Sequence, residues 1–186
     1  MNLILAVTGA TGALAARLLM DRSPWPVALV ASKWGKDVYQ RECGSFEQLA
    51  AKAAEVYDDS DLSAPIASGS VPTAGMVILP CTSSAMAHIA AGTGETLIAR
   101  AAHCHLKERR PLVLCVRETP WSLIDLDNAR AVAAAGGIIM PLSPPFYMAG
   151  AKDPAQVTAA ELLGSYVDRV LALLGHAAPA NWNTVK

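Results

Sequence analysis

The sequence has few charged or aromatic residues and no marked excess of either charge. Charged side chains make up 17% of the 186 residues and aromatic side chains 5%, and 15 Lys and Arg nearly balance 16 Asp and Glu, for a formal net charge of -1. A chain without a basic surplus lacks the electrostatic footprint of nucleic-acid binding. We therefore expect no nucleic-acid partner.

Long apolar runs and paired cysteines are also missing. No run reaches the about 20 residues that span a bilayer, and Met1 and Asn2 lead into an apolar segment without the basic region or cleavage site of a signal peptide. The cysteines, at positions 43, 81, 104 and 115, have no paired spacing, which is typical of reduced thiols. We expect no membrane contact and a cytoplasmic location.

Apolar residues, by contrast, make up 53% of the chain, and its Ala-rich helical segments carry few charges. A monomer would expose much of this apolar surface to water. We therefore expect a homo-oligomer.

Apolar runs alternate with helical segments along the whole chain. A uniformly apolar run is typical of a strand buried on both faces of a parallel sheet. The pattern predicts one doubly wound, Rossmann-like or flavodoxin-like α/β domain over residues 1–186, with a mostly parallel sheet and a C-terminal tail at 176–186. Strands are expected at 3–7, 27–31, 56–57, 75–79, 112–116 and 138–140, and helices from 13, after 33 with a break at 44–45, and at 85–91, 95–107, 126–135 and 155–174.

A glycine-rich turn, Thr8-Gly9-Ala10-Thr11-Gly12-Ala13, separates the first strand from the first helix. Unpaired N–H groups and the positive end of the helix dipole meet there, so the turn predicts a phosphate cradle, although glycines also serve any tight strand-to-helix turn. The full dinucleotide fingerprint is absent, and the second strand is followed by Ser32 and Lys33 instead of an acidic residue. These two features argue against NAD.

Hydroxyl side chains follow the fourth predicted strand. Thr82, Ser83 and Ser84 are consecutive, and any one of them could be a helix N-cap. Because the carboxyl ends of parallel strands share one edge of the sheet, we expect these residues to lie near Thr11 and Ser32. Together they would form a ring of donors for a polar ligand.

Charged residues gather around the fifth predicted strand. Arg100 and Lys107 are seven residues apart, two turns along one helical stripe, so both cations can face the same way. A solvated helix face is the plainer interpretation of the cations at 107–110. Arg117 and Glu118 directly follow the strand, at the edge where open parallel sheets bind ligands, and are a candidate site.

Three other chemistries have weaker support. The His-Cys-His segment at 103–105 places adjacent residues on different sides of a helix, so we interpret it as helix surface and predict no metal site. A hydrolase built on Ser83 or Ser84 with His88 lacks a G-x-S-x-G turn and an acidic partner. Cys81, at a strand end, fits a buried structural thiol better than a nucleophile.

A series of longer blocks keeps its order and spacing from the first strand to the last helix. The blocks are Pro65–Ser70, Gly75–Ile78, Pro80–Cys81, Arg100–Ala102, Leu106–Leu114, Arg117–Pro120 and Pro145–Tyr147. Taken together, they resemble the flavin prenyltransferases, the UbiX family of flavoproteins.

The resemblance implies an enzyme that binds FMN at the carboxyl edge of the sheet. It would transfer a dimethylallyl group from dimethylallyl phosphate to N5 and C6 of reduced FMN, making prenylated FMN for a partner decarboxylase. The FMN contacts it implies are Gly9, Ala10, Thr11, Ser32, Thr82, Ser83, Ser84, Ala85 and Arg117. The prenyl phosphate site it implies consists of Arg100, Lys107, Arg117, Tyr147 and Arg169, and Glu118 would be the acid/base residue that acts with Arg100 and Lys107 in catalysis.

The chain departs from the family pattern at several positions. Thr11 stands where Ser is usual, Ala85 where Thr is usual, Glu95-Thr96 where an Asp-Asn pair is usual, and Asp125 where His is common. Two alternatives therefore stay open: an FMN-binding paralogue that acts as a decarboxylase or oxidoreductase, and a non-catalytic flavin carrier. A cation cluster accepts either a monophosphate or a pyrophosphate donor, so the sequence leaves that choice open as well.

Overall fold

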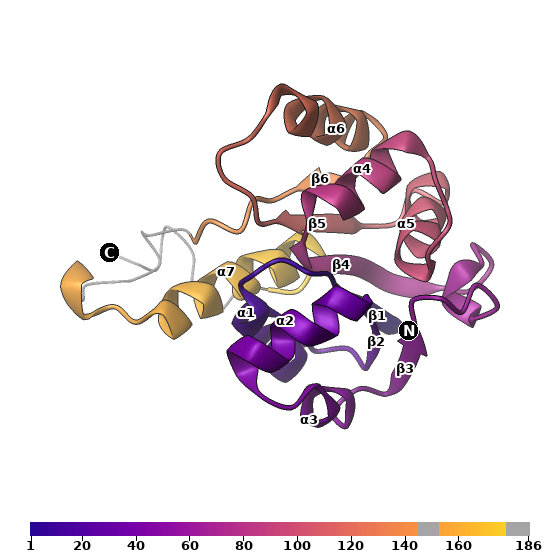
Figure 1. The fold of residues 1–186 in the computed structure, drawn as a ribbon. Helices are drawn as coiled ribbons and strands as arrows, with labels where there is room; N and C mark the ends of the chain where they lie inside the picture. Colours follow the sequence, from indigo (N-terminus) through magenta and orange to yellow (C-terminus); the bar gives the residue numbers. More distant parts are fainter. Residues whose placement is uncertain (145–152, 178–186) are drawn as a thin grey trace.

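The computed structural model of the chain describes residues 1–144 and 153–177. Its strands are β1 (Asn2–Val7), β2 (Val27–Ala31), β3 (Glu55–Asp58), β4 (Thr73–Cys81), β5 (Leu112–Val116) and β6 (Ile138–Ile139). Within the described residues they form one all-parallel sheet in the order β3-β2-β1-β4-β5-β6 (Figure 1). This is the doubly wound Rossmann order, which opens a crevice between β1 and β4. The predicted fold class is confirmed.

Helices cover both faces of the sheet (Figure 1). One face carries α1 (Ala13–Arg22), α2 (Lys33–Cys43), α3 (Phe46–Ala50) and α7 (Ala159–Leu173). The other face carries the 3-10 turn η1 (Pro65–Ala67), α4 (Ser83–Ala91), α5 (Leu97–Lys107) and α6 (Leu123–Ala134). A second 3-10 turn, η3 (Pro154–Gln156), precedes α7.

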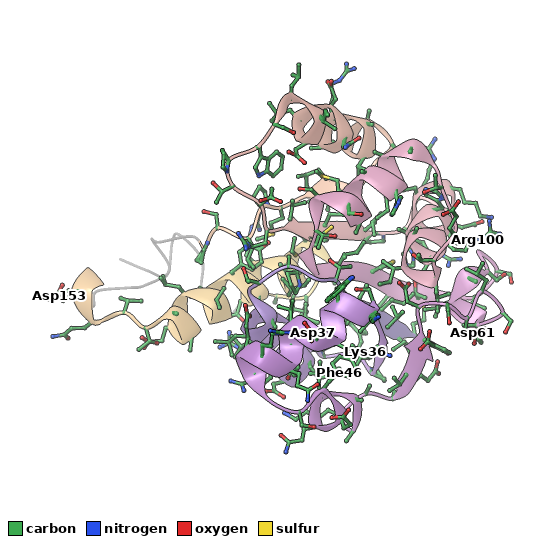
Figure 2. All side chains as sticks on the ribbon, in the orientation of Figure 1. Lys36, Asp37, Phe46, Asp61, Arg100 and Asp153 are labelled. Atoms are coloured by element: carbon green, nitrogen blue, oxygen red, sulfur yellow. The ribbon has the colours of Figure 1, made fainter. Side chains whose placement is uncertain are left out.

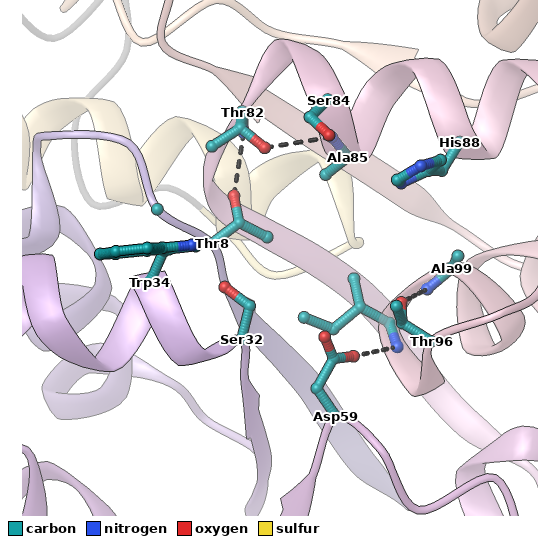
Figure 3. Close-up of a pocket in the computed structure, with 12 residues that line it drawn as sticks. Thr8, Ser32, Trp34, Asp59, Thr82, Ser84, Ala85, His88, Thr96 and Ala99 are labelled. Atoms are coloured by element: carbon teal, nitrogen blue, oxygen red, sulfur yellow. Dashed lines mark hydrogen bonds between the residues drawn. The ribbon is translucent and has the colours of Figure 1, made fainter.

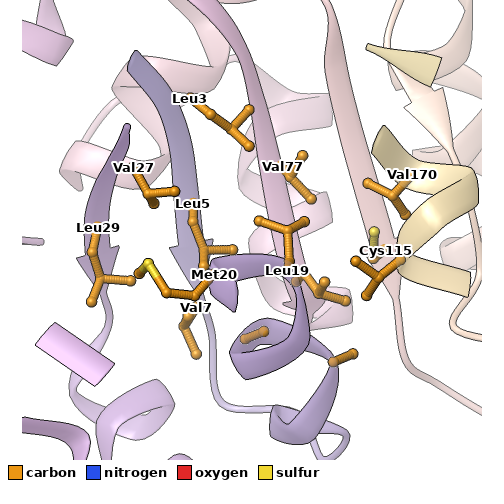
Figure 4. Packing of buried hydrophobic residues seen from close by; sticks show 14 of the residues in the cluster. Leu3, Leu5, Val7, Leu19, Met20, Val27, Leu29, Val77, Cys115 and Val170 are labelled. Carbon is orange, nitrogen blue, oxygen red and sulfur yellow. The ribbon is translucent and has the colours of Figure 1, made fainter. Parts of the chain in front are cut away.

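The side chains of β1 alternate between the two cores. Leu3 and Leu5 pack with Leu19 of α1, as Figure 4 shows, while Ile4 and Ala6 face the opposite layer. All five are 0% exposed. Full burial of a leucine stabilises the fold by about 1.5–3 kcal/mol. A strand that is apolar on both faces is therefore stable only between two helical layers, which explains why the apolar runs predicted the strands.

Capping boxes determine where α6 and α7 begin, and both starts differ from the residues predicted from the sequence. Ser122 Oγ accepts a hydrogen bond from the Asp125 N–H (3.2 Å), and Asp125 Oδ2 accepts one from the Ser122 N–H (2.9 Å). These bonds pair backbone donors that a helix start otherwise leaves free, so α6 begins earlier than the predicted 126. Thr158 and Glu161 form the same motif at the start of α7, which begins later than the predicted 155.

The first turn of α6 exposes apolar side chains. Leu123 and Ile124 are each 73% exposed and Leu126 is 53% exposed. Contact with another subunit would bury this patch, as expected for the homo-oligomer that the composition predicts. Within the described residues, no helix has both the length and the apolar character needed to cross a membrane.

Gly35 lies where the backbone of α2 touches the end of β1. A Cβ at this position would lie 2.2 Å from the Val7 carbonyl oxygen, a contact that only a shift of the helix could relieve. We expect Gly35→Ala to lower the free energy of unfolding by about 1–3 kcal/mol, the usual cost of overpacking. Urea unfolding measures this loss. The control Lys36→Ala, at the partly exposed neighbouring position, should lower the free energy of unfolding by less than about 1 kcal/mol. Equal losses of stability in the two variants would contradict the close contact between Gly35 and the Val7 carbonyl.

Candidate active site

A cleft opens at the carboxyl edge of the sheet, where β1 and β4 are neighbours (Figure 3). Its volume is about 290 Å³, near the lower end of the ~300–1,000 Å³ typical of small-molecule sites. Of the predicted FMN contacts, Gly9, Ser32, Thr82, Ser84 and Ala85 meet in this cleft. Among the described residues, the lining consists of Thr8, Gly9, Ser32, Trp34, Asp59, Thr82, Ser84, Ala85, His88, Thr96, Ile98 and Ala99.

Thr8 joins the two central strands at the base of the cleft. Its hydroxyl donates to the Pro80 carbonyl oxygen (2.8 Å) and accepts a hydrogen bond from the Thr82 N–H (2.9 Å). The residue is 4% exposed. Because both strands end at this cross-link, it fixes the distance between the lining residues that follow β1 and β4. The sequence pattern indicated only a turn at this position.

Thr8→Val keeps the shape of the side chain and removes the hydroxyl. We expect it to lower the free energy of unfolding by about 1–3 kcal/mol, because the Thr82 N–H is left without its partner. The control Thr8→Ser keeps the hydroxyl and should stay closer to wild type. Denaturant unfolding of both variants measures the difference. A valine variant as stable as the serine variant would show that the cross-link contributes nothing.

Three hydroxyls in the cleft, those of Ser32, Thr82 and Thr96, are helix N-caps. Ser32 Oγ accepts a hydrogen bond from the Gly35 N–H (3.0 Å), and Thr82 Oγ1 accepts one from the Ala85 N–H (3.0 Å). Capping uses a lone pair on the oxygen and leaves the hydroxyl hydrogen available. The two interpretations weighed from the sequence, cap and ligand donor, are therefore compatible at these positions.

The turn after β1 differs from the predicted phosphate cradle. At the start of α1, the Glu42 carboxylate accepts hydrogen bonds from the Gly12 N–H (2.9 Å) and the Ala13 N–H (2.8 Å). The Glu42 carboxylate thus occupies the donors that a phosphate would use. The prediction of a phosphate cradle is therefore wrong for the Gly12 and Ala13 N–H groups. Thr11 is exposed and Ala10 is buried, and neither lines the cleft.

The walls of the cleft are aromatic and apolar. Trp34 is 64% exposed at the start of α2, and Figure 3 shows its indole beside Thr8. Ile98 and Ala99 of α5 line the other side. Asp59 holds the start of α5, because its Oδ1 accepts a hydrogen bond from the Ile98 N–H (2.9 Å). A flat exposed ring facing apolar side chains, with hydroxyls at the base, suits a planar ligand that carries polar groups.

Arg117 and Glu118 follow β5 and are not among the lining residues of the cleft. The Arg117 N–H donates to the Cys81 carbonyl oxygen (3.0 Å), which aligns the ends of β4 and β5. In the described chain, Arg117 Nε is buried without a hydrogen-bond partner. The exposed Glu118 carboxylate accepts hydrogen bonds from the Thr119 N–H (3.0 Å) and the Ser83 hydroxyl (3.3 Å). Ser83 therefore turns toward Glu118 and away from the cleft.

Arg100 and Lys107 lie on one face of α5, as predicted, and this face covers the segment from η1 to Gly69. Arg100 Nε donates to the Ala67 carbonyl oxygen (3.3 Å), and a Cβ on Gly69 would lie 2.8 Å from Lys107 Nζ. Both residues are exposed, and Figure 2 shows Arg100 at the outer edge of the molecule. Neither lines the cleft. Within one chain, the two cations are therefore separated from the residues predicted to bind FMN.

The two remaining predicted substrate residues are also away from the cleft. Tyr147 lies outside the described residues. Arg169 is exposed on α7, beside Asp168, which forms an ion pair with Arg22 of α1 (2.8 Å). Helix α7 packs on the face of the sheet opposite α4 and α5. Arg169 is not among the residues that line the cleft.

The His-Cys-His segment of α5 is not the surface that the sequence predicted. Cys104 and His105 are 2% and 1% exposed. His105 Nδ1 lies 2.8 Å from the Ala101 carbonyl oxygen, to which it donates, and Nε2 lies 2.8 Å from the Thr73 hydroxyl. Burial lowers the pKa of His105, so the ring is a neutral link between α5 and β4. Cys81 is also buried, and burial raises the pKa of its thiol.

A crevice at the switch point of a doubly wound sheet, with hydroxyls and a tryptophan around it, defines a ligand-binding α/β protein of the nucleotide-binding class. The chain belongs to the Flavoprotein family, whose family model matches residues 1–168. It is similar to the flavin prenyltransferase UbiX of Deinococcus radiodurans, with 45% identity over 81% of this chain and 75% of the relative. The UbiX flavin prenyltransferase of Thermoplasma acidophilum is 39% identical over 94% of this chain and 95% of the relative.

Solved structures agree with this assignment. A crystal structure of AnUbiX (PadA1) in complex with FMN and dimethylallyl pyrophosphate has a TM-score of 0.90 and 35% identity, covering 98% of this chain and 97% of that chain. A dodecameric FMN-dependent UbiX-like decarboxylase from Escherichia coli O157:H7 has a TM-score of 0.87 and 37% identity, covering 97% and 98%. The predicted family is confirmed.

The sequence patterns missed several residues that line the cleft. Trp34 follows Ser32 closely, so its place just after a buried strand was an available signal. Asp59 begins a polar connection after β3, where no periodicity marks its position. The sequence suggested His88 only as the partner of a serine nucleophile, in the hydrolase alternative. The structure instead places it in the cleft with Thr96, the N-cap of α5.

Proposed function

We propose that this protein is a flavin prenyltransferase that joins the dimethylallyl group of dimethylallyl phosphate to N5 and C6 of reduced FMN. The observation that carries the proposal is the cleft between β1 and β4, with hydroxyls at its base and Arg117 and Glu118 close by, in a chain of the UbiX family. The prenylated FMN would serve a partner decarboxylase.

Donors left free around the cleft support FMN as the ligand. Ser32 and Thr82 each keep a hydroxyl hydrogen, and Arg117 Nε is a buried donor without a partner in the described chain. Trp34 and Ile98 add flat and apolar surface. A flavin needs this combination, because its planar ring carries carbonyl groups and its side chain carries hydroxyls and a phosphate. The contacts we propose are Gly9, Ser32, Thr82, Ser84, Ala85 and Arg117.

We place the prenyl phosphate between subunits. Arg100 and Lys107 lie on the face of α5 that covers η1 and Gly69, and neither lines the cleft of its own chain. A homo-oligomer can bring this face of one subunit to the cleft of another. The oligomer is supported by the apolar patch at the start of α6 and by the dodecameric relative from Escherichia coli. Tyr147 and Arg169 remain proposed members of this phosphate site.

In the proposed reaction, the C–O bond of the donor breaks and the phosphate leaves with the bonding electrons. Arg100 and Lys107 would stabilise the negative charge that develops on its oxygen, without a metal ion. N5 of reduced FMN bonds to C1 of the allyl group, and the departing phosphate takes up the N5 proton. The double bond of the allyl group then takes up a proton at C2 while C3 bonds to C6, and C6 loses its own proton. Glu118 would accept that proton, since its exposed carboxylate is held in place by Thr119 and Ser83.

We also propose that the protein works in the cytoplasm as the single domain predicted from its sequence. All four cysteines are free thiols, which fits a reducing compartment. Burial raises the pKa of Cys115 to about 12, so this thiol stays protonated and unreactive at neutral pH.

Delivery of the product to a second enzyme tests the proposed function. The protein is incubated anaerobically with reduced FMN and dimethylallyl phosphate, and the protein-free filtrate is added to an apo decarboxylase that requires prenylated FMN. We expect decarboxylation that depends on both substrates. A flavin carrier would deliver FMN alone and leave the second enzyme inactive, which would contradict the proposal. A parallel reaction with the pyrophosphate identifies the preferred donor.

A further inference from the structure

His88 is a cleft residue for which the proposed reaction has no role. It lies on α4 three residues after Ala85, and both line the cleft. Residues three apart share a helix face, and side chains tilt toward the helix start, so the imidazole covers the surface next to Ala85. Figure 3 shows the His88 ring on the side of α4 that faces the other lining residues. The ring has no hydrogen-bond partner in the part of the chain that the structure describes.

The rest of the cleft lacks a positive charge. No Lys or Arg is among the described residues that line it. Its acidic member, Asp59, already accepts a hydrogen bond from the Ile98 N–H at 2.9 Å. The start of α1, which could have held an anion, is occupied by the Glu42 carboxylate. His88 therefore adds a ring nitrogen to the hydroxyl donors of the cleft, and a hydrogen bond from it to a phosphate would be charge-assisted because the acceptor is ionised.

The start of α4 adds donors to the same face. Ser84 contributes a hydroxyl, and the first turn of the helix carries the positive end of its dipole. Ala85 contributes nothing beyond its N–H, which already bonds to the Thr82 hydroxyl. A phosphate at this turn would lie one helical turn before His88, in the direction toward which helical side chains tilt.

We propose that His88 binds the phosphate of FMN and supplies the donor that an alanine at position 85 lacks. This inference rests on the proposed function, because it assigns one end of the same flavin substrate. His88 would then select the phosphorylated flavin over riboflavin, which has the same ring and no phosphate.

Binding titrations with FMN and with riboflavin test the inference. We expect His88→Leu to weaken FMN binding roughly ten-fold or more, the usual loss for a hydrogen bond to a charged group, while riboflavin binding changes by less than about two-fold. His88→Lys should restore FMN binding, because an ammonium group also donates hydrogen bonds to a phosphate. Ala85→Thr in the His88→Leu background should restore part of it through a hydroxyl on the same helix face. The control His176→Leu, an exposed histidine that does not line the cleft, should bind both flavins like wild type.

The outcomes separate this inference from the function on which it rests. If His88→Leu binds FMN as tightly as wild type, the inference is wrong and the proposed function is untouched. If it loses FMN and riboflavin equally, His88 shapes the cleft without binding the phosphate, which also overturns the inference. If the wild-type protein binds neither flavin, the proposed function itself fails.

Discussion

Glu118→Gln is expected to bind FMN and the prenyl donor normally and to stop after the first alkylation. The amide oxygen can keep the hydrogen bond from the Thr119 N–H, and the amide nitrogen can donate to the Ser83 hydroxyl, so both neighbours stay in place. An amide cannot take up the proton that C6 must lose, and general-base catalysis is worth about 10²–10⁴ in rate. The second bond should therefore form at least about 100-fold more slowly.

Rapid quenching followed by mass spectrometry and absorption spectroscopy of the extracted flavin measures this effect. An N5-alkylated flavin that has not closed at C6 should accumulate in Glu118→Gln and not in wild type. Glu95→Gln, an exposed acid that does not line the cleft, serves as the matched control and should behave like wild type. If Glu118→Gln makes the finished prenylated FMN at the wild-type rate, Glu118 is only a structural partner of its neighbours.

Arg100→Gln is expected to slow the first alkylation while leaving FMN binding unchanged. Loss of one charge-assisted donor to a developing negative charge typically lowers the rate by about 10²–10³, or about 2.7–4 kcal/mol. FMN binding should persist because Arg100 does not line the cleft. Single-turnover kinetics with a saturating donor measures the loss. The control Arg109→Gln removes an exposed cation nearby on the chain and should retain activity. Equal losses of rate in the two variants would show that Arg100 acts only through its contribution to the overall charge.

Mixed oligomers extend this test to the proposed position of the phosphate site. If Arg100 of one subunit serves the cleft of another, a mixture of Arg100→Gln and Glu118→Gln subunits contains some sites with both residues intact. After dissociation and reassembly, the mixture should recover part of the activity that each variant lacks alone. No recovery in verified mixed oligomers would place both residues in a site made by one chain.

The inner strands β1, β2, β4 and β5 were predictable because each carries buried apolar side chains on both faces. Leu112–Val116, for example, is buried along its whole length, and no amphipathic helix has this pattern. The hydroxyls at strand ends were equally readable, since Ser32 and Thr82 cap the helices that follow and face the cleft. Buried strands and helix N-caps depend on residues that are close in the sequence, so short stretches of sequence are enough to predict them.

Features that depend on contacts between distant residues were not predictable. The turn after β1 has the pattern of a phosphate cradle, but Glu42, 30 residues beyond Gly12, occupies its donors. The spacing of Arg100 and Lys107 gave their shared helix face correctly and could not show that this face covers η1 instead of the cleft. Helical periodicity gives the relative direction of side chains on one helix and leaves open which part of the molecule they meet.

The most direct test of the account is the mass and structure of the flavin extracted after anaerobic incubation of the protein with reduced FMN and dimethylallyl phosphate. We predict FMN carrying one added dimethylallyl unit joined at both N5 and C6, formed only when protein and donor are both present. Recovery of unmodified FMN from protein that binds both substrates would contradict the assignment as a flavin prenyltransferase.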